Sequence, residues 1–192
     1  MTTSPPPEEF ACWLLLAFAF VLLLGSCARQ TPPPVAVSVP AEPVSFIDDV
    51  KPLLDKRCVV CHSCYNAACQ LKLSSYEGVD RGGSKDAVYS SDRLTDQAPS
   101  RLFFDAKTTE QWRQMGFHSV TDNPGQGLAN ESIMAYFLDA KRRNPVPEGR
   151  YHAEATDLTC AADSDEARSF LGKHPGRGMP FGFPPVADAD HD

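Results

Sequence analysis

The stretch FIDDVKPLLDKRCVVCH, residues 46–62, ends in a C-x-x-C-H motif formed by Cys58, Cys61 and His62. Two thiols at this spacing can add to the two vinyl groups of a haem, and the adjacent imidazole then reaches the proximal face of the iron. The motif therefore predicts covalently attached haem c, held by Cys58 and Cys61, with His62 as the proximal iron ligand.

Two other metal sites remain open, because further cysteines follow closely. C-x-x-C-x-x-C is how a bacterial iron–sulfur run begins, but Cys69 comes one residue late and Gln70 follows it where proline is expected. A zinc knuckle would combine the C-x-x-C pair with two of Cys64, Cys69 and His62, yet no second C-x-x-C pair stands at finger spacing. We favour the haem interpretation over both.

The residues before the motif predict a helix that leads into it. Ser45 and Asp48 are spaced as an N-terminal capping pair. Apolar residues then recur at helical spacing, at Phe46, Val50, Leu53 and Leu54. Pro52 should kink this helix or restart it, because proline lacks the amide hydrogen that the helix interior needs.

Two more helices are predicted, and they make the fold mainly α. One runs from Thr109 through Met115 and is closed by Gly116, and the other runs from Asn130 to about Arg143. The second has a basic end, which suits the negative end of a helix dipole. We expect a cytochrome-c-like haem domain with a long insertion between the haem motif and the Met-Pro loop that contains Met179.

The chain starts with features of an exported lipoprotein. Residues 10–25 form an uncharged apolar run that is shorter than the about 20 residues of a membrane span. Leu24-Gly25-Ser26-Cys27 resembles a lipobox, in which the cysteine is acylated. We predict a signal peptide over residues 1–26, although its start holds Glu8 and Glu9 instead of basic residues, and a lipid anchor at Cys27. An uncleaved anchor is the alternative.

The remaining boundaries follow from composition. Residues 27–44 are proline-rich and predict an extended linker after the anchor. Residues 45–185 form the predicted haem domain, and residues 186–192 form a disordered tail. The net charge of −7 gives no footprint for nucleic acid. Together these features predict a periplasmic protein, anchored to the membrane through Cys27.

The distal face of the haem iron needs a ligand or an open position. Met179 is the strongest candidate, because it lies in Gly178-Met179-Pro180-Phe181, a stretch without helix capacity. Met115 and Met134 lie on predicted apolar helix faces, where methionine is usually part of the core. His174 is the alternative ligand. It ranks below Met179, because a histidine in a loop is more often solvated than bound to metal.

After the predicted signal peptide, and once the haem pair and the anchor are assigned, Cys64, Cys69 and Cys160 remain. Cys64 and Cys69 are five residues apart in a turn-like stretch. In an oxidising compartment a local disulfide between them is the expected outcome. Cys160 would then lack a partner within the chain.

The chain resembles the periplasmic fatty acid cis/trans isomerases, which are haem c-containing enzymes of Gram-negative bacteria. The resemblance rests on residues 46–62 and above all on the continuation SCYNAACQLKLSS, residues 63–75. Further matching segments are Pro99-Ser100-Arg101-Leu102-Phe103, the segment from Gln111-Trp112-Arg113 to Gly116-Phe117, and Lys173-His174-Pro175 with Gly178-Met179-Pro180.

The resemblance implies an isomerase that acts on cis double bonds in the acyl chains of membrane phospholipid or of free unsaturated fatty acid. In that chemistry ferric haem withdraws electron density from the double bond, the bond rotates, and the electron returns, without ATP or an external cofactor. Position by position, Cys58 and Cys61 hold the haem and His62 is its proximal ligand.

The chain also departs from the family. Members that look like this one run several times longer, and they continue through another helix after the Gly-Met-Pro stretch. We therefore expect the closing helix of the cytochrome-c-like fold to be missing, so that a truncated, inactive member stays an alternative. A second alternative is a lipid-anchored monohaem c-type cytochrome that passes electrons to a redox partner.

Overall fold

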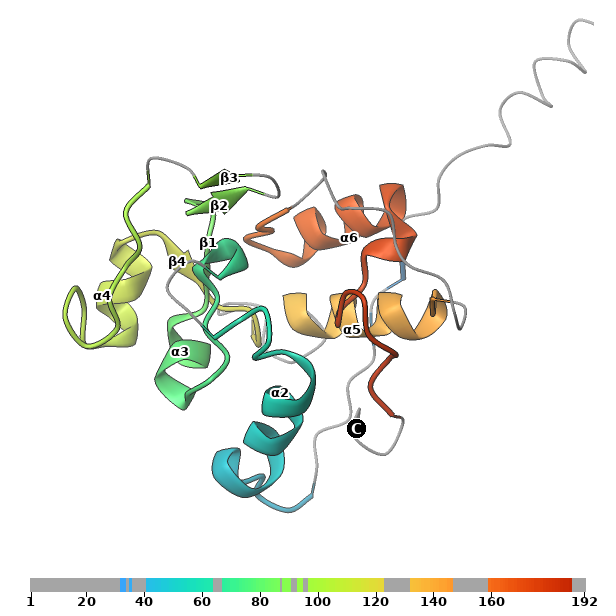
Figure 1. Ribbon diagram of the computed structural model, residues 1–192, viewed down its shortest axis with the longest axis horizontal. Coiled ribbons are helices and arrows are strands. Elements are labelled where there is room, and N and C mark those ends of the chain that lie inside the picture. Colours follow the sequence, from blue (N-terminus) through green and yellow to red (C-terminus); the bar gives the residue numbers. More distant parts are fainter. Residues whose placement is uncertain are drawn as a thin grey trace, which may run out of the picture. The chain divides into compact units, whose positions relative to one another are not determined.

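The computed structural model describes residues 32–33, 35, 41–63, 67–86, 88–90, 93–94, 97–122, 132–146 and 159–187. All of them lie in the second of the chain's two units, residues 31–192. This part is mainly helical, as predicted, and carries two short antiparallel ribbons (Figure 1). The predicted signal peptide and its anchor at Cys27 lie outside the described residues.

The helix before the C-x-x-C-H motif forms in two pieces. A π-helical turn, η1 (Phe46–Val50), runs directly into α2 (Lys51–Arg57). The Ser45 hydroxyl accepts a hydrogen bond from the Asp48 amide at 3.2 Å and donates one to its carboxylate at 2.8 Å, so the predicted capping pair is confirmed. Pro52 lies in the first turn of α2, where its missing amide hydrogen has no helical partner to lose. The prediction that Pro52 restarts the helix is therefore confirmed.

A second group of elements surrounds α4 (Thr109–Gln114). This helix ends at Met115, and Gly116 follows with φ +85°, so its predicted closure is confirmed. The helix α3 (Tyr76–Arg81), which the sequence analysis did not predict, packs beside it. The Thr109 hydroxyl donates to the Asp80 carboxylate at 2.6 Å and joins the two helices.

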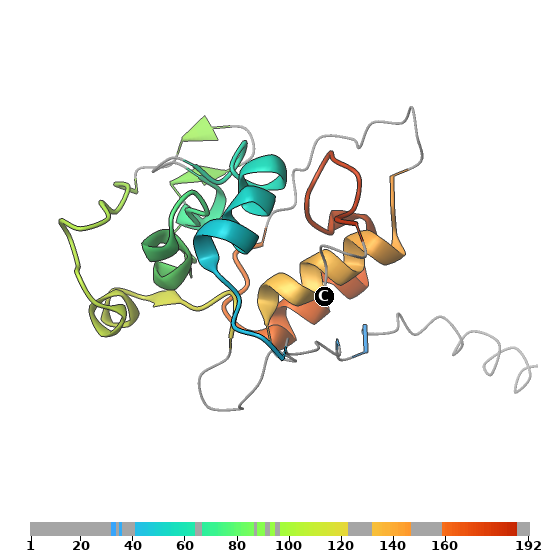
Figure 2. The ribbon, with the colours of Figure 1, turned by 90° about the horizontal axis from the view of Figure 1, so that it is seen from below.

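The longest helices are α5 (Ile133–Arg143) and α6 (Ser164–Lys173), which lie side by side in both views (Figure 1 and Figure 2). Ser132 caps α5, so this helix begins three residues later than predicted. Asp163 caps α6 by accepting from the Glu166 amide at 2.8 Å. The sequence analysis did not predict α6, although the pair Asp163 and Glu166 has the spacing of a capping box.

The α5–α6 pair carries the main hydrophobic core. Its buried members are Val35, Val120, Ile133, Tyr136, Ala140, Ala161, Ala167 and Leu171. A smaller core lies under α4 and consists of Leu102, Ala106, Trp112 and Phe117. None of the helices among the described residues has the length and apolar character needed to cross a bilayer.

Two buried side chains lie in stretches predicted as the linker and the tail. Val35 falls in the predicted linker, yet it is 4% exposed and belongs to the main core. The Arg168 guanidinium also donates to the Pro32 carbonyl at 3.0 Å, so this part of the linker is bound to the domain. Val186 falls in the predicted tail and is nevertheless buried, while residues 188–192 lie outside the described part. Each valine is an apolar side chain within a proline-rich or acidic stretch, and it is buried although the composition of the stretch predicts exposure.

The strands are short, with two residues each. β1 (Gly83–Ser84) pairs antiparallel with β4 (Phe117–His118), with Gly83 opposite His118. β2 (Tyr89–Ser90) and β3 (Arg93–Leu94) form a separate antiparallel pair. Gly82 precedes β1 with φ +79°, and a Cβ there would lie 1.9 Å from the His118 carbonyl oxygen, so only glycine permits this pairing.

The loop that contains Met179 packs against the end of α5. The 3-10 turn η4 (Pro175–Arg177) contacts both α5 and α6. A Cβ on Gly178 would lie 2.2 Å from the Lys141 amide nitrogen, so glycine is required for this close approach. The Lys141 side chain is fully buried, and among the residues that the structure describes its ammonium nitrogen has no hydrogen-bond partner. Burial lowers the pKa of Lys141, because the charged form is poorly solvated there.

We predict that Lys141→Met stabilises the protein. The folded state binds the Lys141 proton less tightly than the unfolded state, so the lysine reduces stability at pH 7 and this penalty shrinks as the pH rises toward the ordinary pKa of lysine. Removing the buried, unpaired charge should raise the free energy of unfolding by about 1 to 3 kcal/mol at pH 7. Urea unfolding at several pH values measures this difference.

Lys173→Met is the matched control, because Lys173 lies in the last turn of α6 and is exposed. It should leave the free energy of unfolding nearly unchanged. A Lys141→Met protein that is less stable than the parent at pH 7 would contradict the interpretation.

Candidate functional site

The C-x-x-C-H motif forms a tight turn that continues from α2. The Cys58 amide donates to the Leu54 carbonyl at 2.8 Å, which extends the helical hydrogen bonding by one residue. The Cys58 carbonyl then accepts from the amides of Cys61 at 3.1 Å and of His62 at 3.0 Å. All three motif residues therefore belong to a single turn whose backbone is hydrogen-bonded.

Both thiols of the motif are free. Cys58 is half-buried and Cys61 is exposed, and neither forms a disulfide. Burial raises the pKa of the Cys58 thiol, which outweighs the opposing effect of the Arg57 charge. Cys58 is therefore a neutral thiol at pH 7, and the pair keeps the two sulfur atoms that thioether attachment requires.

The His62 imidazole is oriented by a backbone carbonyl. Its Nδ1 lies 3.1 Å from the Leu71 oxygen. Because a carbonyl only accepts, Nδ1 carries the proton and Nε2 keeps its lone pair. Burial lowers the pKa of His62, against the smaller effect of the Leu71 hydrogen bond, so the ring is neutral at pH 7. A neutral imidazole held through its other nitrogen is the usual state of a metal-binding histidine.

Residues 71–73 hold the motif from the side. The Leu73 amide donates to the His62 carbonyl at 2.7 Å. The Lys72 ammonium donates to the Ser63 carbonyl at 2.8 Å. Leu71, whose carbonyl binds His62, packs its side chain against the main hydrophobic core. The site is thus connected to the core through this short segment.

A buried polar cluster fixes the start of this segment. The Gln70 side chain donates to the Asp86 carbonyl at 2.6 Å and accepts from the Ser100 amide at 2.9 Å. The Arg81 guanidinium is fully buried and donates to the carbonyls of Gln70 and Ser100. It also lies over the Phe117 ring, 4.9 Å from its centroid. The cluster therefore joins residues 70, 81, 86 and 100 across the fold.

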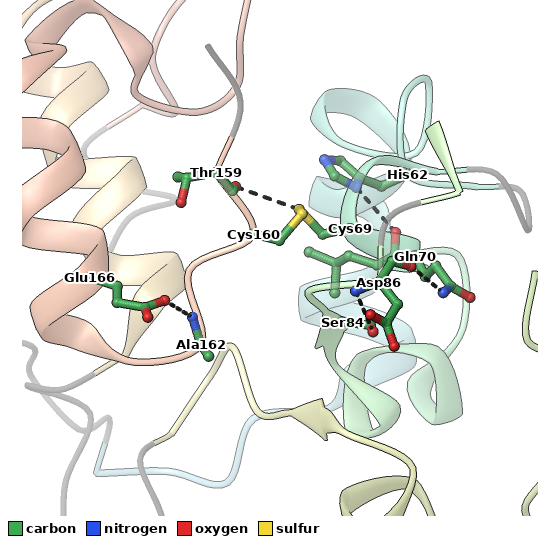
Figure 3. The surroundings of a disulfide bond; sticks show 10 residues. His62, Cys69, Gln70, Ser84, Asp86, Thr159, Cys160, Ala162 and Glu166 are labelled. Carbon is green, nitrogen blue, oxygen red and sulfur yellow. Dashed lines mark hydrogen bonds between the residues drawn. A yellow bond between two sulfur atoms is a disulfide. The ribbon is translucent and has the colours of Figure 1, made fainter. Parts of the chain in front are cut away.

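A disulfide provides a second anchor beside Gln70. Cys69 is bonded to Cys160, which lies just before α6 and 91 residues away along the chain (Figure 3). The predicted pair of Cys64 and Cys69 is therefore wrong, and Cys160 has a partner. Cys69 has φ +56°, and its sulfur lies 3.5 Å from the Thr159 oxygen, so the local backbone directs it toward the segment before α6. Cys64 itself lies outside the described residues.

The disulfide also bears on the two alternative metal sites. A zinc knuckle or an iron–sulfur centre that used Cys69 would need a free thiolate, which this residue lacks. Among the described residues, no group of three or more histidine, cysteine, aspartate or glutamate side chains is placed to hold a metal ion. A zinc knuckle of Cys58, Cys61, Cys64 and His62 does not involve Cys69, and Cys64 lies outside the described residues. The two free thiols and the adjacent imidazole are the residue types that covalent haem c would use.

The structure does not bring Met179 and His62 into a described contact. Met179 is half-buried, and its amide donates to the Phe137 carbonyl of α5 at 2.9 Å. The hydrogen bonds described for His62 are instead with Cys58, Leu71 and Leu73. Distal ligation by Met179 therefore stays a prediction.

The other distal candidates have structural roles of their own. Met134 packs against the main core, as predicted for a methionine on an apolar helix face. Met115 ends α4 and is 43% exposed. The His174 ring packs on Phe170, with ring centroids 4.8 Å apart, at the end of α6.

Sequence reasoning missed the residues that position the site. They are Gln70, Leu71, Lys72, Leu73, Arg81 and Cys160. Their partners lie far away along the chain or are backbone carbonyls, which no sequence motif marks. The one available signal was the odd number of cysteines that remain after the predicted signal peptide, the anchor and the haem pair, and it left the pairing undetermined.

Comparison with known proteins gives one match. The family model described as fatty acid cis/trans isomerase (CTI) matches residues 97–192. This range includes the segments around Ser100, Trp112 and Met179 on which the sequence resemblance partly rests, and it does not include the C-x-x-C-H motif. The searches of curated proteins and of solved structures found no match.

We predict that Cys160→Ser destabilises the protein strongly. The disulfide closes a loop between positions 91 residues apart, so its loss should lower the free energy of unfolding by roughly 4 kcal/mol. Urea unfolding without added oxidant measures this change. Peptide mapping of the unreduced parent protein identifies the bonded pair.

Cys64→Ser is the matched control, and it should change the free energy of unfolding by less than about 0.5 kcal/mol. The reverse pattern, with Cys64→Ser harmful and Cys160→Ser tolerated, would restore the local pairing.

Proposed function

The chain belongs to the fatty acid cis/trans isomerase family, and on this premise we propose that it converts cis double bonds of unsaturated acyl chains into trans double bonds with the help of haem c. The substrates would be membrane phospholipids or free unsaturated fatty acids. The observation that carries the proposal is the His62 imidazole, neutral and held through Nδ1 by the Leu71 carbonyl at 3.1 Å, beside two free thiols.

The residues of the motif fit covalent haem. Cys58 and Cys61 would form the two thioethers, and Nε2 of His62 would bind the iron. When bound, the haem supplies an iron that can withdraw electron density from a double bond, which lowers the barrier to rotation about that bond. The Leu71 carbonyl keeps the His62 ring in one orientation, and the turn at Cys58 keeps both sulfur atoms on the same short segment.

A cytochrome-c-like arrangement, with an insertion between the motif and the Met-Pro loop, is part of the proposal. Met179 is the proposed distal ligand, because its loop is fixed to α5 by the Phe137 carbonyl and by the close packing of Gly178 on Lys141. The haem domain would begin at residue 45, with Val35 packed in its main core and the Pro32 carbonyl bound by Arg168.

Export to the periplasm is also proposed, with a signal peptide over residues 1–26 and acylation of Cys27. The disulfide between Cys69 and Cys160 supports an oxidising compartment, because such bonds rarely persist in the cytosol. Acylation would place the domain at a membrane surface, close to its proposed substrate.

The test is an isomerase assay of the full chain, produced with the machinery for c-type haem attachment. The protein is mixed with vesicles of cis-unsaturated phospholipid or with free cis-unsaturated acid, and trans acyl chains are measured by gas chromatography. We expect trans product from the parent protein and none above background from His62→Ala, since this variant keeps both thioether cysteines and loses the proximal ligand.

His118→Gln is the matched control, because His118 is also a half-buried histidine but belongs to β4. It should retain isomerase activity. Absence of trans product from a parent protein with confirmed covalent haem would overturn the proposal and favour the electron-carrying cytochrome. A zinc-containing protein without haem would overturn both.

A further inference from the structure

The turn between Arg101 and Lys107 presents two neighbouring aromatic rings to solvent. Phe103 is 59% exposed and Phe104 is 75% exposed. Both rings precede α4, next to the smaller hydrophobic core. Soluble surfaces carry single apolar side chains without consequence, but two adjacent phenylalanines at this exposure form an apolar projection that the fold does not use.

Hydrogen bonds and buried neighbours fix the conformation of this turn. The Arg101 amide donates to the Asp105 carboxylate at 2.6 Å, and the Arg101 guanidinium donates to it at 2.7 Å. These hydrogen bonds lower the pKa of Asp105, so the ion pair persists at neutral pH. Leu102 and Ala106 flank the two rings along the chain and are each 4% exposed in the smaller core. The rings are therefore displayed by a fixed base.

The backbone at Phe103 adds a second observation. Its φ of +69° lies in the left-handed region, which favours glycine or asparagine and disfavours a bulky side chain. The turn itself would form more easily with glycine at this position. A phenylalanine that is both exposed and unfavourable for the local backbone contributes nothing evident to folding, so its use lies outside the folded chain.

Charged side chains lie on both sides of the two rings along the turn. The Arg101 guanidinium lies 5.6 Å from the centroid of the Phe104 ring, and Lys107 is exposed at the other end of the turn. Met115, which is 43% exposed, lines a surface depression beside Phe104. The two rings thus lie between an exposed cation, Lys107, at one end of the turn and the ion pair of Arg101 with Asp105 at the other.

We propose that residues 101–107 dock the protein on the surface of a phospholipid bilayer. Phe103 and Phe104 enter the boundary between head groups and acyl chains, while Arg101 and Lys107 lie at the level of the phosphates. The choice of this partner rests on the proposed function, since an enzyme that acts on phospholipid acyl chains must meet the bilayer.

The order of polarity favours a bilayer over a protein partner. Aromatic side chains are enriched at the head-group level of membranes, and the long cationic side chains reach outward to phosphate from an inserted segment. The turn matches this layering from tip to base. The chain as a whole has a net charge of −7, so the cationic ends are a local feature of this turn and not a general property of the surface.

The first test maps which residues contact acyl chains. The full chain is reconstituted in phosphatidylcholine vesicles that contain a phospholipid with a photoactivated carbene precursor on its acyl chain. Trypsin releases residues 102–107 as one peptide and residues 73–81 as another. The second peptide carries Tyr76, which is 60% exposed and is the matched control for Phe103. We expect at least about tenfold more label in residues 102–107, because acyl contact requires insertion of the turn.

The second test separates docking from catalysis. The double variant Phe103→Gly, Phe104→Ser should keep its melting temperature or raise it, since glycine suits the backbone at position 103. It should lower isomerisation of phospholipid in vesicles about tenfold, and leave isomerisation of a soluble cis-unsaturated acid unchanged, because loss of two partly inserted rings costs that order of affinity. Tyr76→Ser is the control and should change neither rate.

Equal labelling of the two peptides, or an unchanged vesicle rate in the double variant, overturns the proposal. A double variant that dissociates an oligomer in detergent, while vesicle labelling stays low, overturns it in favour of a protein interface. The labelling map does not depend on turnover, so a protein without isomerase activity that still labels in residues 102–107 supports docking and contradicts only the proposed function.

Discussion

The hydrogen bonds of the buried Arg81 guanidinium connect the candidate site to the rest of the structure. The guanidinium binds the carbonyls of Gln70 and Ser100 and lies over the aromatic rings of the smaller core. A buried cation is stable only when its donors are satisfied and its charge is partly balanced. The two terminal nitrogens of Arg81 donate to carbonyl oxygens, and the faces of the Trp112 and Phe117 rings lie against its charge. The result is a fixed point from which residues 71–73 run to His62, so the imidazole is oriented by groups that are themselves held from the core.

The site is built from one local element and several distant ones. The turn at Cys58 follows directly from α2, and everything in it comes from a short stretch of chain. Its orientation depends on Leu71, whose side chain packs on the main core, and on the bond from Cys69 to Cys160 before α6. The half of the chain that matches the family model therefore supports the half that carries the haem motif. Arg113 shows the same dependence, because its guanidinium donates to the Arg81 carbonyl at 2.8 Å from the family-matched side.

Features encoded by neighbouring residues could be predicted from the sequence. The cap at Ser45, the restart at Pro52 and the closure of α4 at Gly116 each depend on contacts within about one helical turn. The disulfide could not be predicted in the same way, since its partner lies 91 residues away and short spacing favoured Cys64. α3 has only six residues and contains Gly78, so its helical signal is weak. Val35 was assigned to the linker because composition describes a whole stretch, whereas burial is decided for each side chain.

The long span of the disulfide imposes an order on the chemistry of the cysteines. A chain is synthesised from its amino terminus, so the cysteines at 58, 61, 64 and 69 exist before Cys160 has been made. In the oxidising compartment of the proposed function, a bond formed in this interval would join neighbours, and one that includes Cys58 or Cys61 would consume a thiol that the proposed thioethers need. The proposed function thus requires free thiols at Cys58 and Cys61 for haem attachment and a disulfide at Cys69, all within one short stretch of chain. Maturation of this protein is consequently a problem of timing between reduction and oxidation, in addition to a problem of folding.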